Sequence, residues 1–198
     1  MRRRLAATVL ALLVAGAGAG CGNDSAAAVL DPPLCPVGSS GAGNGVILMA
    51  QSVPTAAWVP CVQSSLPLGW GFAHLDARDG MSRFWLDSDR DGTSAIEVRL
   101  EESCDTSGAT EIASDREYMH RLERVRQVSP TYSGERHYVF RGGCLSIVFR
   151  LDGDSPGEAL ALASQAVGVV SREDLRTQVH AESGGRVELD PSRGDGQP

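Results

Sequence analysis

Residues 69–104, GWGFAHLDARDGMSRFWLDSDRDGTSAIEVRLEESC, decide the fold of this chain. The tripeptide Arg-Asp-Gly occurs twice in them, at 78–80 and at 90–92, and each copy separates stretches in which apolar and polar residues alternate. Alternation with a period of two indicates a half-buried antiparallel strand, and Asp-Gly supplies the positive φ that a short hairpin loop needs. The sequence therefore predicts a three-stranded meander over residues 69–103.

The alternation also predicts which side chains share a face of the meander. The expected apolar face holds Trp70, Phe72 and His74 in the first strand, Phe84 and Leu86 in the second, and Ile96, Val98 and Leu100 in the third. Trp85 falls on the opposite face, with Arg83 and Asp87 as neighbours on its strand. If solvent covers that face, Trp85 is an exposed aromatic residue and a candidate contact residue.

Elements on both sides of the meander are predicted from shorter patterns. VILMA (46–50) is a fully apolar run that predicts a buried strand. Residues 114–128 fit either a helix that begins at a capping box or a strand from about Arg121 that runs into a hairpin at Ser133-Gly134, and we favour the strand. HYVF (137–140) and CLSIVFRL (144–151) flank two glycines and predict a further hairpin.

The end of the chain changes to helical signals. Ser155 and Pro156 are typical of a helix start and predict a helix within 155–170, and Ser171 with Asp174 repeats the signal for 171–182. Strands followed by helices predict an α+β fold, with a mostly antiparallel sheet over residues 46–150 and one or two C-terminal helices packed on one face. Residues 183–198 have no periodicity and are predicted to form a disordered tail.

The first residues, MRRRLAATVLALLVAGAGAGCGNDS, predict export. Three arginines precede an apolar run that is short for a membrane span, so residues 1–20 are interpreted as a signal peptide. With Ala19-Gly20-Cys21 the segment resembles a bacterial lipoprotein signal. The resemblance implies cleavage before Cys21, a diacylglycerol on its thiol and anchoring at the outer face of the cell membrane. A cut after Ala19 that releases a secreted protein, or an uncleaved anchor, are the alternatives.

Counting cysteines agrees with a lipid on Cys21. The chain has five cysteines, and without Cys21 an even set remains, which is Cys35, Cys61, Cys104 and Cys144. Four cysteines allow three pairings, of which we favour Cys35–Cys61 and Cys104–Cys144. The predicted organisation is a lipidated tether over 21–34 followed by one disulfide-stapled domain over 35–182.

The charge balance excludes some partners. The chain carries a net charge of −7, and removal of Arg2, Arg3 and Arg4 with the signal leaves 15 arginines against 25 acidic residues, a net charge of −10. So acidic a domain is not expected to bind nucleic acid or to adhere to anionic lipid by its surface. The lipid anchor is therefore the expected link to the membrane.

The stretch DSDRDG (87–92) has two interpretations. Asp87, Asp89 and Asp91 match the first half of an EF-hand-like calcium loop. The second half does not match, because Val98 stands where a bidentate glutamate would close the coordination sphere. We interpret the stretch as a hairpin turn, and keep a weak calcium-binding module as an alternative.

Catalytic motifs give no positive signal. The chain has no Gly-x-Ser-x-Gly, no His-Glu-x-x-His and no lysine for a Ser-x-x-Lys pair. His74 and His137 fall in predicted strands, and only a compact cluster of either with carboxylates in a deep pocket would indicate an envelope hydrolase. The sequence thus predicts a non-catalytic binding domain without a cofactor, whose partner is another envelope protein or a cell-wall component.

Three further stretches, SVPTAAWVPC (52–61), DSDRDG (87–92) and RGGC (141–144), resemble parts of uncharacterised exported lipoproteins of actinobacterial type. The resemblance implies the same extracytoplasmic location and carries no mechanism.

Overall fold

The computed structural model describes residues 27–29, 31–36 and 43–190, which adopt an α+β fold. Within these residues, an eight-stranded antiparallel sheet has the strand order β1-β3-β4-β5-β9-β8-β7-β6. Its strands are β1 (Ala27–Val29), β3 (Trp70–Arg78), β4 (Met81–Ser88), β5 (Gly92–Glu101), β6 (Thr110–Ile112), β7 (His120–Gln127), β8 (Tyr132–Phe140) and β9 (Gly143–Leu151). A second sheet pairs β2 (Trp58–Val62) with β10 (Val167–Ser171). The helices are α1 (Asn44–Ser52), α2 (Pro156–Ala166) and α3 (Arg172–Glu182), and none of them is long and apolar enough to cross a membrane.

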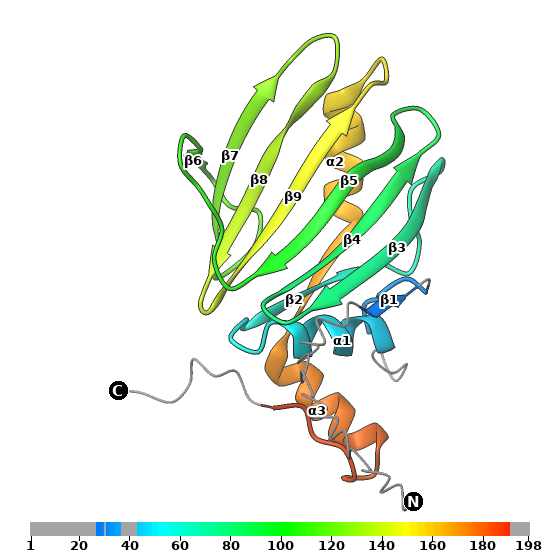
Figure 1. The fold of residues 1–198 in the computed structure, drawn as a ribbon, viewed down its shortest axis with the longest axis vertical. Coiled ribbons are helices and arrows are strands. Elements are labelled where there is room, and N and C mark those ends of the chain that lie inside the picture. Colours follow the sequence, from blue (N-terminus) through cyan, green and yellow to red (C-terminus); the bar gives the residue numbers. More distant parts are fainter. Residues whose placement is uncertain (1–26, 30, 37–42, 191–198) are drawn as a thin grey trace, which may run out of the picture.

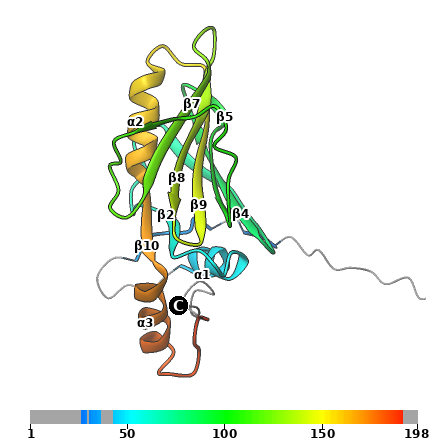
Figure 2. The ribbon, with the colours of Figure 1, turned by 90° about the vertical axis from the view of Figure 1, so that its left-hand side faces the viewer.

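The core lies between the eight-stranded sheet and the elements that cover one of its faces, which are α2, α1 and the β2–β10 sheet, and it continues to α3. Figures 1 and 2 show α2 along one face of the sheet, with the small β2–β10 sheet and α1 near one end of that face and α3 beyond it. We call this the covered face, and its largest fully buried side chains include Phe84, Leu86, Ile96, Leu100, Tyr138, Leu145, Ile147 and Phe149. The opposite face, which carries His74, Trp85, Glu97 and Val148, is called the open face. Burial of so many large apolar side chains is the main source of the fold's stability.

The predicted meander is confirmed, with one correction. β3, β4 and β5 are consecutive antiparallel strands, and Gly80 and Gly92 have φ of 78° and 99° at the two turns. However, the register of β3 shifts between Phe72 and His74. Phe72 therefore pairs with Leu86 of the covered face, whereas His74 pairs with Trp85 of the open face. A bulge adds one residue to the strand and breaks the alternation that the sequence implies.

The predicted strand at residues 46–50 is wrong, because this segment lies within α1. A short, fully apolar run does not distinguish a strand from a buried helix. Val46, Met49 and Ala50 are all 0% exposed and follow the i, i+3, i+4 spacing of one helix face. The tertiary surroundings thus decide the conformation of this run.

The strand favoured from about Arg121 is confirmed by β7, and the hairpin around Gly142-Gly143 by β8 and β9. The hairpin at Ser133-Gly134 is wrong. The turn between β7 and β8 lies at residues 128–131, and Gly134 is inside β8. A Cβ at Gly134 would approach the ring of Phe149 to 2.7 Å, so glycine is required there by close packing and not by a turn.

Segments predicted as flexible are partly ordered. Residues 27–29 of the predicted tether form β1, and Leu34 bridges to Val62. In the predicted tail, Leu189 is 2% exposed, and its carbonyl accepts a hydrogen bond from Arg176. The first C-terminal helix also ends earlier than residue 170, because residues 167–171 form β10 beside β2. Cys21, the proposed lipidation site, lies outside the described residues.

Both favoured disulfides are present. Cys35–Cys61 joins the entering chain to β2, and Cys104–Cys144 joins the β5–β6 connection to β9. This connection, residues 102–109, crosses the open face from β5 to the far edge of the sheet, and Arg124 of β7 donates a hydrogen bond to the carbonyl of Ser107. The second disulfide therefore holds a strap across one half of the open face.

Candidate functional site

A groove of about 790 Å³ lies between the β4–β5 turn and the start of α2. Figure 1 shows that these elements are at the end of the sheet away from α3. Three connections and the start of α2 form its walls. Its lining consists of Pro67, Leu68, Gly69 and Trp70 before and in β3, Ser88, Arg90 and Asp91 at the β4–β5 turn, Asp152, Gly153, Asp154 and Ser155 before α2, and Glu158, Ala159 and Leu162 on α2. This volume is within the range of sites that bind small molecules or short segments of chain.

Hydrogen bonds join the three connections, so the walls of the groove are pre-formed. The backbone N–H of Asp89 donates to the carbonyl of Gly69 at 2.8 Å, which links the β4–β5 turn to the β2–β3 connection. The carboxylate of Asp91 accepts from the Ser88 hydroxyl at 2.8 Å and from the Gly153 N–H at 3.0 Å, which links the same turn to the connection before α2. A site built in this way loses little conformational entropy when a ligand binds.

A buried ionic network fixes α2, the fourth wall, against the sheet. Arg136 of β8 is only 9% exposed, and it donates to Glu123 of β7 and to the Ser164 hydroxyl of α2, both at 2.8 Å. Burial alone would raise the pKa of Glu123, but its hydrogen bonds with Arg136 and Arg121 and their charges lower it overall. The charged form of Glu123 therefore belongs to the native packing of α2.

The groove combines an acidic rim with exposed apolar side chains. Asp91 uses both of its oxygens within the protein, and Asp152 accepts from the Thr131 hydroxyl at 2.5 Å. Asp154 and Glu158, by contrast, are exposed and form no hydrogen bond or ion pair with any residue that the structure describes. Leu68 and Leu162 line the same groove with 103% and 39% of their surfaces exposed.

The three aspartates of DSDRDG have separate roles. Asp87 accepts from the N–H of Ser94 at 2.7 Å, Asp91 is buried and bonded as above, and Asp89 is exposed. They do not belong to any group of converging metal-ligand atoms found in the described part of the chain. The stretch is a hairpin turn that closes β4 and β5 and forms one wall of the groove.

Trp85 lies on the open face and is only partly exposed. Its ring stacks on the ring of His74, with centroids 4.2 Å apart, and the guanidinium of Arg83 lies 4.9 Å from its centroid. Arg83 in turn lies within 4.0 Å of Asp76 and Glu97. The indole is thus part of a cross-strand cluster of charged and aromatic residues, which leaves less of its ring free for a ligand than the sequence implied.

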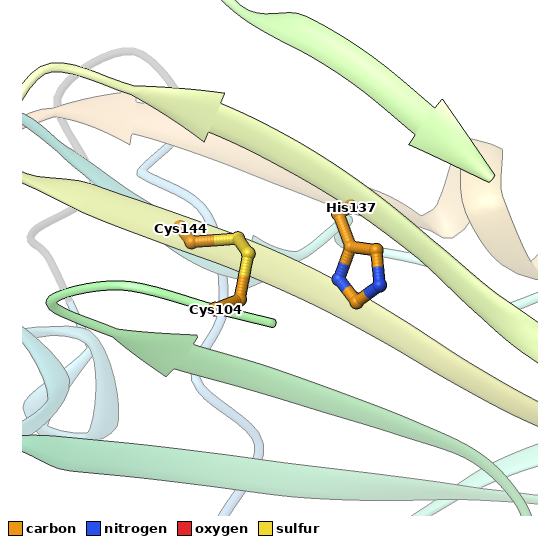
Figure 3. A group of neighbouring side chains, drawn as sticks. All are labelled: Cys104, His137 and Cys144. Atoms are coloured by element: carbon orange, nitrogen blue, oxygen red, sulfur yellow. A yellow bond between two sulfur atoms is a disulfide. The ribbon is translucent and has the colours of Figure 1, made fainter. Parts of the chain in front are cut away.

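Cys104, His137 and Cys144 place their sulfur and nitrogen atoms within 4.8 Å of one another (Figure 3). The two sulfurs are joined in the disulfide, so the thiolates that a metal ion would need are not present. Nδ1 of His137 lies 2.9 Å from the Ser146 hydroxyl, and Nε2 lies 3.6 Å from Glu135. Burial lowers the pKa of His137. The group is therefore a disulfide with a buried histidine packed beside it.

The histidines do not form a site with the groove. His137 lies beside the strap and His74 on the open face, and neither is in the groove lining. His120 is exposed and lies 3.3 Å from Glu111, while His180 lines a shallower hollow of about 360 Å³ on α3. Neither His74 nor His137, the two histidines for which the sequence raised a hydrolase pocket, lines the groove or this hollow.

The groove was missed in the sequence because its lining comes from four distant segments. Leu68 carries the strongest local signal, since a leucine between Pro67 and Gly69 in a turn has no strand or helix face to bury it. Asp154 and Glu158 are read from the sequence only as the start of a helix. Nothing local indicates that these segments meet.

Comparison of the chain with protein-family models, with curated proteins and with solved structures gives no match.

Proposed function

We propose that this protein is a binding domain of the bacterial cell envelope, anchored by a lipid on Cys21 to the outer face of the cell membrane. In this proposal the groove binds another extracytoplasmic molecule, and no chemical step takes place in it. The observation that carries the proposal is the groove itself, with pre-formed walls, exposed leucines and carboxylates that have no partner in the described residues.

The disulfides support the extracytoplasmic location. Four cysteines are paired in two bonds, and such bonds persist mainly in oxidising compartments. Cys21 is the one cysteine of the sequence that these bonds leave over. A free thiol is unusual in an exported protein, whereas a thiol that carries lipid accounts for the odd number.

The composition of the groove supports binding rather than catalysis. Neither histidine nor cysteine occurs in its lining, and of its two serines, Ser88 and Ser155, the first donates to Asp91. Exposed leucines beside free carboxylates are instead the mixture of apolar and polar groups that recognises a ligand.

Photo-crosslinking tests the binding function. A photoreactive amino acid at Leu162 reports on the groove, and the same amino acid at Gln165, which is exposed on α2 outside the groove lining, is the matched control. We expect an adduct with an envelope molecule at position 162 and none at 165. No adduct at either position, or equal adducts at both, would contradict the proposal.

Mass spectrometry of the mature protein tests the anchor. We expect an N-terminal Cys21 that carries a diacylglycerol, and we expect Cys21→Ser to move the protein from the membrane to the soluble fraction. An intact Met1, or an unmodified chain that begins at Gly20 or Cys21, would contradict lipid anchoring.

A further inference from the structure

We propose that the groove binds an extended, arginine- or lysine-bearing peptide segment of another exported protein. This inference rests on the binding function proposed above and adds the chemical class of the ligand. The occupant is a short stretch in which cationic side chains reach Asp154 and Glu158 while an apolar side chain packs against Leu68 and Leu162.

The charge of the groove selects a cation. Its lining holds four carboxylates, those of Asp91, Asp152, Asp154 and Glu158, against the single guanidinium of Arg90. The two carboxylates on α2 and just before it have no partner in the part of the chain that the structure describes. A ligand that neutralises them gains charge-assisted hydrogen bonds, and a ligand of the same sign is repelled.

The positive end of the α2 dipole does not reverse this preference. Glu158 is in the first turn of α2, where a carboxylate already compensates the dipole. An anionic ligand would have to overcome repulsion by Glu158 and Asp154 before it could accept hydrogen bonds from the N–H groups at the start of α2. The groove as a whole therefore stays acidic.

The carboxylates are distributed along the groove, and this arrangement favours a peptide as the ligand over a metal ion. They come from separate segments and do not converge into a ligand cluster in the described residues. Calcium needs six to eight oxygens around one point. Cationic side chains spaced along a peptide can instead meet carboxylates that are spaced along a groove.

The groove also borders an edge of the sheet next to Trp70, whose own N–H donates to the carbonyl of Pro67 at 3.0 Å. Trp70 is in the lining and begins β3, an outer strand of the sheet that β1 covers only at Leu75, Asp76 and Ala77. Within the described residues, no strand pairs with the outer edge of β3 at residues 70–74. Such an edge accepts an added strand.

A second copy of this chain fits less well. Without its signal residues the chain carries a net charge of −10, so two copies repel each other. An acidic domain that presents an acidic groove requires a partner of opposite charge.

The test measures binding of defined peptides to the full chain by fluorescence anisotropy. The first peptide alternates arginine and leucine, the second has citrulline in place of arginine and keeps its shape without charge, and the third has glutamate. The groove variant is Asp154→Asn with Glu158→Gln. The control variant, Glu102→Gln with Glu182→Gln, changes the net charge equally at exposed positions outside the groove lining.

We expect the arginine peptide to bind best and its affinity to fall about fivefold or more in the groove variant, as for the loss of two exposed ion pairs. The control variant keeps the affinity of the wild type. Circular dichroism confirms that both variants are folded.

Four outcomes would overturn the inference. An equal loss of affinity in the groove variant and the control variant means that the net charge of the protein alone determines peptide binding. Equal or tighter binding of the citrulline or glutamate peptide in the groove means that the ligand is not cationic. A dimer that the groove variant dissociates means that a second copy is the occupant. If no peptide binds, the peptide ligand is wrong, and the crosslink at Leu162 then tests the binding function separately. An adduct there supports a binding function with another ligand, and the absence of an adduct contradicts both proposals.

Discussion

Two aspartates of the β4–β5 turn, Asp89 and Asp91, differ in what their side chains do. Asp91 is 5% exposed and accepts hydrogen bonds from Ser88 and Gly153, whereas Asp89 is exposed. We expect Asp91→Ala to lower the free energy of unfolding by about 2 kcal/mol, because it leaves two donors without their acceptor. Asp89→Ala is expected to change it by less than about 0.5 kcal/mol. Urea unfolding measures both, and equal effects would contradict this division of roles.

His137 predicts a dependence of stability on pH. Burial lowers its pKa from 6.5 in the native state, so the unfolded chain binds the proton more readily. Stability is then complete above about pH 6.5 and declines as the pH falls below it. The lowered pKa values of Glu123 and Glu135 act only at pH values below 4.5, so they do not contribute to this interval.

Unfolding in urea at about pH 7.5 and pH 5.5 tests this, and a His137 variant separates the histidine from Glu101, whose pKa is raised by burial and whose effect on stability has the opposite sign. We expect His137→Gln to reduce the difference in unfolding free energy between the two pH values. An unchanged difference would mean that another group takes up the proton.

Single residues also show which side-chain positions can be predicted from the sequence and which cannot. The faces of β4 and β5 follow from alternation, and Phe84, Leu86, Ile96, Val98 and Leu100 are all buried as expected. The face of His74 could not be predicted, because the bulge that moves it is decided by pairing with β4 and leaves no local signal. The groove could not be predicted for the same reason, since Leu68 and Leu162 line one groove only after the sheet and α2 have packed.

At the scale of elements, each of the two disulfides joins an irregular segment to a strand, Cys35 to β2 and Cys104 to β9. They join residues 26 and 40 positions apart, for which the loss of loop entropy in the unfolded chain corresponds to about 3.5 and 4 kcal/mol. We expect Cys104→Ser with Cys144→Ser to lower the free energy of unfolding by about 3–4 kcal/mol. Unfolding in urea checks this, with the wild type under a thiol reductant as the comparison, and a loss of less than about 1 kcal/mol would contradict it.

Helix α2 has one face for stability and one for binding. Leu160 is 3% exposed, whereas Leu162 is 39% exposed and lines the groove. We expect Leu160→Ala to cost about 2–4 kcal/mol of stability, and Leu162→Ala to cost less than about 0.5 kcal/mol while weakening the arginine–leucine peptide. Denaturation and anisotropy on the two variants separate these effects. A large loss of stability in Leu162→Ala would place this residue in the core.

The sequence predicted elements correctly where their hydrophobic pattern was long, and the predictions failed where the pattern was short. The meander, the β8–β9 hairpin and the helix capped by Ser171 repeat one signal over many residues, and the Ser171 hydroxyl does accept from the N–H of Asp174 at 3.0 Å. The five residues of VILMA fit both periods, and β10 has no turn signal between it and α2. In both places contacts with distant segments determine the conformation.

At the scale of the whole molecule, the path of the chain relates the groove to the proposed anchor. Ala27 begins β1 and pairs with Ala77, seven residues along β3 from Trp70 at the groove. Seven residues of strand span about 23 Å. Cys21 precedes Ala27 by only six residues, which reach at most about 20 Å. A lipid on Cys21 therefore attaches the membrane near the end of β3 that is far from the groove.

Energy transfer to an acceptor in the headgroups of a lipid vesicle tests this orientation in the lipidated protein. A fluorescent amino acid at Arg78 reports on the end of β3 near the anchor, and one at Asp154 reports on the groove. We expect stronger transfer from position 78 than from position 154, because the short connection holds the β1 end near the bilayer and directs the groove away from it. Insertion of twenty Gly/Ser residues before Ala27 is expected to lower the transfer at position 78 and to reduce the difference. Equal transfer from both positions in the chain without the insertion would mean that the domain lies on its side, with the groove facing lipid rather than the partner that its charges favour.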